Sequence, residues 1–144
     1  MTILPMSQAD LPEVVHLAEQ LGYPCSLERI ETRFTNINSS HDYALFVAKN
    51  ETHQVVGYIQ INIEPHTLLA DLRAEISALV VDQQQRSLGI GAKLLAQAES
   101  WAKNKGITLI RLRSNTKRTD AHRFYEKNGY KILKSWHSFT KDLI

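Results

Sequence analysis

Residues 80–95 of the chain have the sequence VVDQQQRSLGIGAKLL, and this stretch decides the fold around it. An apolar strand ends at Val81, a short polar loop follows, and Gly89 and Gly91 stand where an amphipathic helix begins. Glycine has no Cβ, so the backbone there can approach a ligand closely. The amides of a first helical turn have no partner within the helix, and the helix dipole adds partial positive charge. The pattern predicts a phosphate-binding loop.

Residues 86–92, called the glycine loop below, do not identify their ligand when taken alone. Glycines at the start of a helix also relieve crowding against a neighbouring strand, and this interpretation stays open on these residues. The loop lacks the Gly-Lys-Ser/Thr sequence of a nucleoside triphosphate site, which disfavours a triphosphate. Its position between a strand and an amphipathic helix favours a role in binding phosphate.

The length of 144 residues fits one domain, which we expect to extend over residues 1–144. Hydrophobic residues make up 43% and charged residues 22% of the chain, as in ordinary globular proteins. A net charge of +2 is too small to indicate a nucleic-acid partner. The single cysteine, Cys25, excludes an internal disulfide and a thiolate metal cluster, and no HxH or HExxH spacing indicates a metal site.

We find no apolar run long enough to cross a membrane and no signal peptide at the start MTILPMSQAD. A membrane partner is therefore not expected, and a cytoplasmic enzyme or binding domain is the expectation.

Hydrophobic periodicity and turn residues predict an α/β domain with a mixed sheet. The order of elements, β-α-α-β-β-β-α-β-α-β-β, lacks the regular alternation of a dinucleotide-binding fold. Helices are predicted from about Pro12 to Leu21, over 26–36, over 90–105 and over 119–127. Strands are predicted at 2–6, 41–49, 55–63, 72–81, 107–112, 130–133 and 137–141.

The chain resembles the GNAT superfamily of acyl-CoA N-acyltransferases. The glycine loop and the strand residues before it are similar to the family's first signature, and Asn115 with AHRFYEKNGY at 121–130 is similar to its second. The resemblance implies a mostly antiparallel mixed sheet of about seven strands, splayed at the middle strands and flanked by about four helices. Within the family, RTDAHRFY at 118–125 and SFTKDL at 138–143 are most similar to the aminoalkylphosphonate N-acetyltransferase group.

The resemblance implies that acetyl-CoA binds at the glycine loop. Backbone amides of the loop would hold the pyrophosphate, and the strand before it would pair with the pantetheine arm like an added strand. Many members have glycine in place of Ser87, but serine still donates its backbone amide. The residues expected to bind acetyl-CoA are Leu79, Val80, Val81, Arg86, Ser87, Leu88, Gly89, Ile90, Gly91, Ala92 and Asn115.

Two of these side chains have a second interpretation. Arg86 either assists at a phosphate or is a solvated side chain. Asn115 either bonds pantetheine or forms the turn at the end of a strand.

The resemblance implies two catalytic residues, Tyr125 as general acid and Glu75 as general base. A phenol with a pKa near 10 can protonate a departing thiolate whose pKa is near 8.5. An amine of pKa about 10 is only about one part in a thousand neutral at pH 7, so a base that removes its proton is needed. Tyr125 is otherwise a core aromatic, and Glu75 is otherwise a solvent-facing strand residue.

We therefore expect an N-acetyltransferase that moves the acetyl group of acetyl-CoA directly to a primary amine of a small molecule, with an aminoalkylphosphonate as one such acceptor. The acceptor pocket is expected from residues 22–36 and 64–74, and the basic residues from Arg111 to Arg123 face either an anionic acceptor, the CoA 3′-phosphate or solvent. The alternatives are a CoA-binding regulatory or interaction domain without catalysis, and acetylation of a protein amine. The resemblance also allows a homodimer.

Overall fold

The computed structural model describes residues 1–20, 22–64, 72–86 and 88–144. Leu21 at the end of the first predicted helix, part of the expected acceptor pocket and Ser87 of the glycine loop lie outside the described residues. The described residues form two compact units, 1–112 and 113–144, which we describe separately.

The first unit contains a five-stranded mixed sheet with strands in the order β1-β2-β3-β4-β5. Neighbouring strands from β1 to β4 pair antiparallel, whereas β5 pairs parallel with β4. The strands are β1 (Thr2–Pro5), β2 (Tyr43–Lys49), β3 (Val55–Ile63), β4 (Arg73–Val81) and β5 (Leu109–Leu112). The helices of this unit are α1 (Leu11–Gln20), α2 (Leu27–Asn38) and α3 (Ile90–Asn104), with short 3₁₀ helices at Gln8–Asp10 and Gln83–Gln85.

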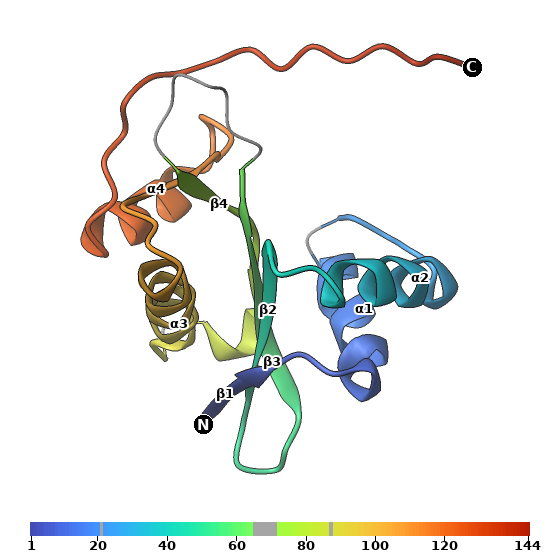
Figure 1. The fold of residues 1–144 in the computed structure, drawn as a ribbon. Helices are drawn as coiled ribbons and strands as arrows, with labels where there is room; N and C mark the ends of the chain where they lie inside the picture. Colours follow the sequence, from blue (N-terminus) through green and yellow to red (C-terminus); the bar gives the residue numbers. More distant parts are fainter. Residues whose placement is uncertain (21, 65–71, 87) are drawn as a thin grey trace. The chain divides into compact units, whose positions relative to one another are not determined.

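Helices α1 and α2 lie on one face of this sheet and α3 lies on the other (Figure 1). A buried cluster joins the first face to its helices: Met6, Leu11, Val14, Leu17, Phe34, Val47, Val55 and Val80. On the other face, α3 buries Ile90, Leu94, Leu95, Ala98 and Ala102. The apolar stripes predicted for the helices at 12–21 and 90–105 therefore account for both halves of the core.

Gly57 in β3 lets α3 pack closely against the sheet. A Cβ at this position would lie 3.0 Å from the Val80 carbonyl oxygen, 3.2 Å from Leu94 Cδ1 and 3.3 Å from Ile90 Cγ2. Contacts this short require neighbouring atoms to move. Gly57 thus fixes the distance between the sheet and the first turns of α3.

A β-bulge interrupts the pairing between β3 and β4. Gln60 pairs with Ala78 and Ile61 pairs with Ile76, so Ser77 is the extra residue on β4. Bulges of this kind bend a strand and redirect its side chains. This one lies between Glu75 and the end of the strand that leads into the glycine loop.

The second unit, residues 113–144, contains α4 (Thr119–Lys127). Gly129 has a φ of 92°, the left-handed conformation that commonly follows a helix C-terminus. With α4, all four predicted helices are confirmed in the described residues.

The prediction of seven strands was wrong, because the described residues form five. Residues 130–144 form no helix or strand, although strands were predicted at 130–133 and 137–141. Alternating apolar residues favour a strand, but a strand also needs a neighbour whose backbone completes its hydrogen bonds. Leu133 and Phe139 are 87% and 92% exposed, so these side chains have no core to pack against.

Candidate active site

The glycine loop enters α3 through a backbone conformation that only glycine adopts readily. Gly89 precedes the first residue of α3 and has φ 79° and ψ 8°, in the left-handed region. Gly89 has no side chain to cap the amides of this first turn, and no other described side chain caps them. The amides of Ile90, Gly91 and Ala92 therefore have no partner within the helix. Together with the helix dipole, they are suited to bind an anion.

The polar residues before the glycine loop hold its starting point in place. Asp82 Oδ1 accepts a hydrogen bond from the Gln84 amide at 3.0 Å, and Gln20 Oε1 from α1 accepts one from the Gln83 amide at 3.1 Å. The Arg86 side chain turns back toward the strand, where its Nε donates to the Val81 carbonyl oxygen at 3.4 Å. The Arg86 side chain is exposed, and its assistance at a phosphate stays a prediction.

The last residues of β4 have a strand neighbour on one side only. Leu79, Val80 and Val81 pair with β3, but the pairing of β4 with β5 ends at Ile76 and Leu112. Among the described strands, none pairs with the other edge of β4 beyond Ile76. This edge can accept an extended ligand by adding backbone hydrogen bonds, as in strand addition.

Glu75 lies in a row of polar side chains that crosses four strands. Tyr43 of β2 pairs with Asn62 of β3, Asn62 pairs with Glu75, and Glu75 pairs with Arg111 of β5. Residues directly opposite one another share a face of the sheet. Side chains two and four positions apart on a strand face the same side, so Tyr43 faces the same side as Val47. Val47 is buried against α1 and α2, and the row therefore lies on the face that these helices cover.

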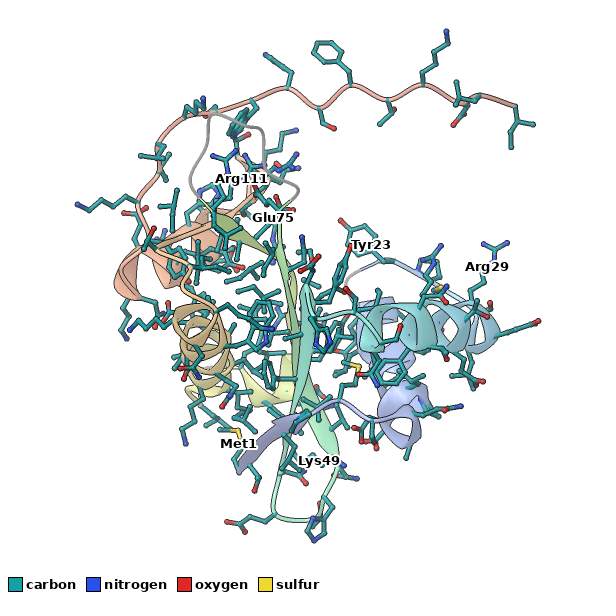
Figure 2. The ribbon with its side chains drawn as sticks, in the orientation of Figure 1. Met1, Tyr23, Arg29, Lys49, Glu75 and Arg111 are labelled. Atoms are coloured by element: carbon teal, nitrogen blue, oxygen red, sulfur yellow. The ribbon has the colours of Figure 1, made fainter. Side chains whose placement is uncertain are left out.

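Four charged residues gather at the β4–β5 end of this row, and we call Glu64, Arg73, Glu75 and Arg111 the charged cluster. Glu64 follows β3 directly and bridges the two arginines: its Oε2 accepts a hydrogen bond from Arg73 Nε at 2.7 Å, and its Oε1 accepts one from Arg111 Nε. Arg111 Nε also lies 3.6 Å from Glu75 Oε2. Figure 2 shows Glu75 and Arg111 close together at this end of the sheet.

The two carboxylates of the charged cluster have different surroundings. Burial raises the pKa of Glu64, but hydrogen bonds from Arg111 and Arg73 and their charges outweigh it, so the pKa is lowered overall. Glu64 is therefore held as an anion and is a poor proton acceptor. Glu75 makes a longer contact with Arg111 than Glu64 does, and its role as a base stays a prediction.

Sequence reasoning singled out Glu75 but missed Glu64 and Arg73. The sequence placed both residues only within the stretch 64–74 expected to line the acceptor pocket, with Glu64 directly after the apolar strand 55–63. The structure adds that the Glu64 side chain is 9% exposed. A charged group buried to that degree is nearly always paired. The sequence could not reveal the partners, because they come from β4 and β5.

Asn115 and Tyr125 belong to the second unit. Asn115 forms a turn after the strand, as one of its two interpretations predicted: its Oδ1 accepts a hydrogen bond from the Lys117 amide at 2.9 Å. Its carbonyl oxygen accepts one from the Arg118 amide at 3.0 Å and lies 2.9 Å from His122 Nε2. A contact with pantetheine stays a prediction.

Tyr125 lies on α4 between two aromatic neighbours. Its ring centroid is 5.2 Å from that of Phe124 and 6.1 Å from that of Tyr130, both in edge-on arrangements. Burial raises the pKa of Tyr125, and the charge of Arg118 lowers it by less. The phenol therefore keeps its proton at neutral pH, which a proton donor requires.

The model of the acetyltransferase (GNAT) family matches residues 11–130. The chain belongs to this family. The match includes the glycine loop, the charged cluster and α4, and thus residues of both units.

Three relatives illustrate the similarity of this GNAT chain to known proteins. An aminoalkylphosphonate N-acetyltransferase of Salmonella typhimurium is 44% identical over 90 residues, which are 62% of this chain and 57% of that protein. A crystal structure of a transcriptional regulator from Bacillus halodurans is 30% identical with a TM-score of 0.85, over 97% of this chain and 99% of that one.

The third is a structure of AAC(6')-Iy in complex with the bisubstrate analogue CoA-S-monomethyl-acetylneamine. It is 17% identical with a TM-score of 0.86, over 98% of this chain and 97% of that one, and supports the fold alone. The aligned part of this chain spans little more than half of its Salmonella relative.

Two further observations concern only the described residues. None of their helices is long and apolar enough to cross a membrane. They also contain no group of three or more histidine, cysteine, aspartate or glutamate side chains placed to hold a metal ion.

Proposed function

We propose that this GNAT protein is an acetyl-CoA-dependent N-acetyltransferase whose acceptor is a primary amine of a small molecule, and that residues 1–144 form one such domain. The observation that carries the proposal is that two features lie together in the described residues. One is the start of α3, where Gly89 has φ 79° and no described side chain caps the helix, and the other is the edge of β4 beyond Ile76, which pairs with none of the described strands. The name of the Salmonella relative supports an aminoalkylphosphonate as the acceptor.

In this proposal, acetyl-CoA is held largely by backbone. The amides of residues 86–92 bind the pyrophosphate, with the free first turn of α3 supplying donors and partial positive charge. Leu79, Val80 and Val81 bond the pantetheine arm along the open edge of β4. Asn115 adds a side-chain contact to that arm. The thioester then lies beyond Ile76, where the pairing of β4 with β5 ends.

Glu75 removes the proton that the amine must lose. Removing a proton from an ammonium group of pKa about 10 costs roughly 4 kcal/mol of free energy at pH 7. A base that contacts the group through a water molecule therefore lowers the barrier. The neutral amine nitrogen then attacks the thioester carbonyl carbon and forms the new C–N bond, and the nitrogen releases its second proton to solvent as the amide forms. The proton taken by Glu75 is later released to solvent.

Tyr125 acts on the leaving group. As the C–S bond breaks, its phenol donates a proton to the CoA thiolate, and the phenolate regains a proton from solvent. The raised pKa of Tyr125 supports this assignment, because the group is protonated before the step.

A second candidate function is a CoA-binding regulatory domain without catalysis. The similarity to a protein described as a transcriptional regulator favours it, since that structure is 30% identical over nearly the whole chain. Acetylation of a protein amine is a third possibility, which the same assay can test with peptide acceptors.

The deciding experiment measures CoA release by the purified protein with acetyl-CoA and a panel of aminoalkylphosphonates, amino acids, polyamines, aminoglycosides and peptide amines. We expect turnover on a small primary amine. Glu75→Gln and Tyr125→Phe should each lower kcat by about 10²–10⁴-fold while acetyl-CoA binding is retained. Tight binding of acetyl-CoA without turnover on any amine would favour the regulatory domain. Full activity of both variants would refute the two residue roles.

Two accompanying proposals concern the whole protein. We propose that it works in the cytoplasm, where acetyl-CoA is available, and that it forms a homodimer. Fractionation of cells and sedimentation of the purified protein test these proposals separately from the activity.

A further inference from the structure

The charged cluster is arranged as one buried anion behind two cations. The Glu64 side chain is 9% exposed, whereas those of Arg73 and Arg111 are 39% and 29% exposed. Glu64 accepts one hydrogen bond on each of its oxygens, and each bond comes from the Nε of a different arginine. Nε is one of five N–H donors of a guanidinium. Glu64 thus fixes both forks at the same end of the sheet.

The charges of the cluster match an acceptor that carries both an ammonium and an anionic group. Arg73 and Arg111 contribute two positive charges against the negative charge of Glu64, and Glu75 adds a second negative charge 3.6 Å from Arg111 Nε. Arg73 and Glu75 are two residues apart on one face of β4, or about 6.6 Å along the strand. An amine separated from an anionic group by one or two carbons can span these two sites.

We propose that Arg73 and Arg111 form the anion-binding half of the acceptor site, so that the enzyme selects short amines bearing a phosphonate or a similar anionic group. This inference rests on the proposed function and extends it, because it assigns acceptor selection to named side chains. Guanidinium forks bind phosphonate-like groups through two parallel hydrogen bonds, which gives orientation as well as attraction. Bound in this way, the acceptor directs its ammonium group toward Glu75.

A purely structural ion-pair network is the competing explanation for the charged cluster. It would stabilise the junction of β3, β4 and β5 without contacting any substrate. The two explanations differ in one respect: a structural role affects all acceptors equally, whereas anion recognition affects only acceptors that carry the anionic group.

The test compares kcat/KM at saturating acetyl-CoA for 2-aminoethylphosphonate, β-alanine and 2-aminoethanol, which carry a phosphonate, a carboxylate and no anion. Arg73→Met is the main variant, because Arg73 is the more exposed of the two arginines. Arg73→Lys keeps the charge without the fork, and Arg111→Met tests the second cation. Lys103→Met, an exposed position on α3, removes the same charge elsewhere and serves as the control.

We expect the wild type to prefer 2-aminoethylphosphonate over 2-aminoethanol, and Arg73→Met to lower kcat/KM for the phosphonate about 10- to 100-fold. The same variant should change the value for 2-aminoethanol by less than about threefold, and Arg73→Lys should recover part of the loss. An equal loss on all three acceptors, or no wild-type preference for an anion, would overturn the inference and leave the proposed function intact.

Calorimetric titration with 2-aminoethylphosphonate keeps the inference testable if no amine is acetylated. Binding that weakens about 10-fold or more in Arg73→Met but not in Lys103→Met would support the anion site even then. Absence of binding to the wild type in the presence of CoA would refute it. Circular dichroism and acetyl-CoA binding identify any variant that fails to fold.

Discussion

The glycine loop and the charged cluster both adjoin strand β4, but the first presents backbone groups and the second presents charged side chains. At the glycine loop the chemistry lies in the backbone: amides at the start of α3 and the open strand edge before it. At the charged cluster it lies in side chains, with two arginines fixed on one carboxylate. The glycine loop should therefore respond to changes in conformation, and the charged cluster to changes in charge.

The largest expected effect comes from Gly57→Val, which changes the packing of α3 on the sheet without altering a residue of the glycine loop. The added side chain meets the Val80 carbonyl oxygen, Leu94 and Ile90, so α3 must move or the core is strained by about 1–3 kcal/mol or more. Thermal unfolding should shift down, and acetyl-CoA should bind more weakly by calorimetry. Gly57→Ala provides a graded control with a smaller effect. Normal stability of the valine variant would show that α3 does not depend on this close contact.

The next effect comes from charge. Glu64→Gln removes the negative charge shared by both arginines and should lower the free energy of unfolding by about 1–2 kcal/mol at pH 7, since both arginines are partly exposed. The pKa of Glu64 in the folded state lies below its ordinary value of 4.5. Its contribution is therefore present above that value and is lost as the pH falls through the folded pKa.

Urea unfolding at pH 7, 5, 4 and 3 checks this sign. The gap between wild type and Glu64→Gln should be largest at neutral pH and should close in acid. Glu51→Gln, in the exposed turn between β2 and β3, should leave the acid dependence unchanged. A gap that widens as the pH falls would contradict the lowered pKa of Glu64.

A smaller effect is expected at the entry to α3. Gly89→Val forces a branched residue into the left-handed region at about 1–2 kcal/mol, although its Cβ would meet nothing within 4 Å. If the loop yields, the KM for acetyl-CoA should rise roughly 10-fold, because about 1.4 kcal/mol corresponds to that factor. Gly89→Asn tolerates the same φ and should lose much less. Equal effects of both variants would point to a contact of the side chain instead of the backbone.

The smallest effect should come from Arg86→Ala. The Arg86 Nε makes one long hydrogen bond to the Val81 carbonyl oxygen, and the residue is exposed. If backbone amides hold the pyrophosphate, the KM for acetyl-CoA should change by less than about threefold, corresponding to under 1 kcal/mol. A 30-fold rise in the KM for acetyl-CoA would contradict this contrast between the two regions, because it would make a side chain the main phosphate ligand.

Most of the fold could be predicted from the sequence because its signals are local. The apolar stripe that begins at Ile90 marks a helix by neighbouring residues alone. Ser26, whose side chain accepts a hydrogen bond from the Arg29 amide, and Gly129, which follows α4, likewise mark helix ends within a few residues. The two C-terminal strands were wrongly predicted, because the alternation near Leu133 and Phe139 does not show whether another strand lies beside them. Backbone pairing is a property of distant segments.

The candidate site divides in the same way. The start of α3 could be predicted because Gly89 marks the left-handed conformation at the entry to the helix, whereas the binding of phosphate there stays a prediction. The role of Glu75 rested on resemblance and stays a prediction. Glu64 and Arg73 were missed, since their meaning arises only when β3, β4 and β5 bring three distant charges together.

The extra residue at Ser77 sets the phase of β4. Before Ser77, the odd-numbered residues face α1 and α2, as Glu75 does opposite Asn62. After Ser77, the even-numbered residues face these helices, as Val80 does opposite Tyr58. Deleting Ser77 alone would remove the bulge and restore regular alternation, with Glu75 still opposite Asn62, Val80 still opposite Tyr58, and both facing α1 and α2. Loss of this residue is thus expected to straighten β4 between Glu75 and the glycine loop without changing the face of either half.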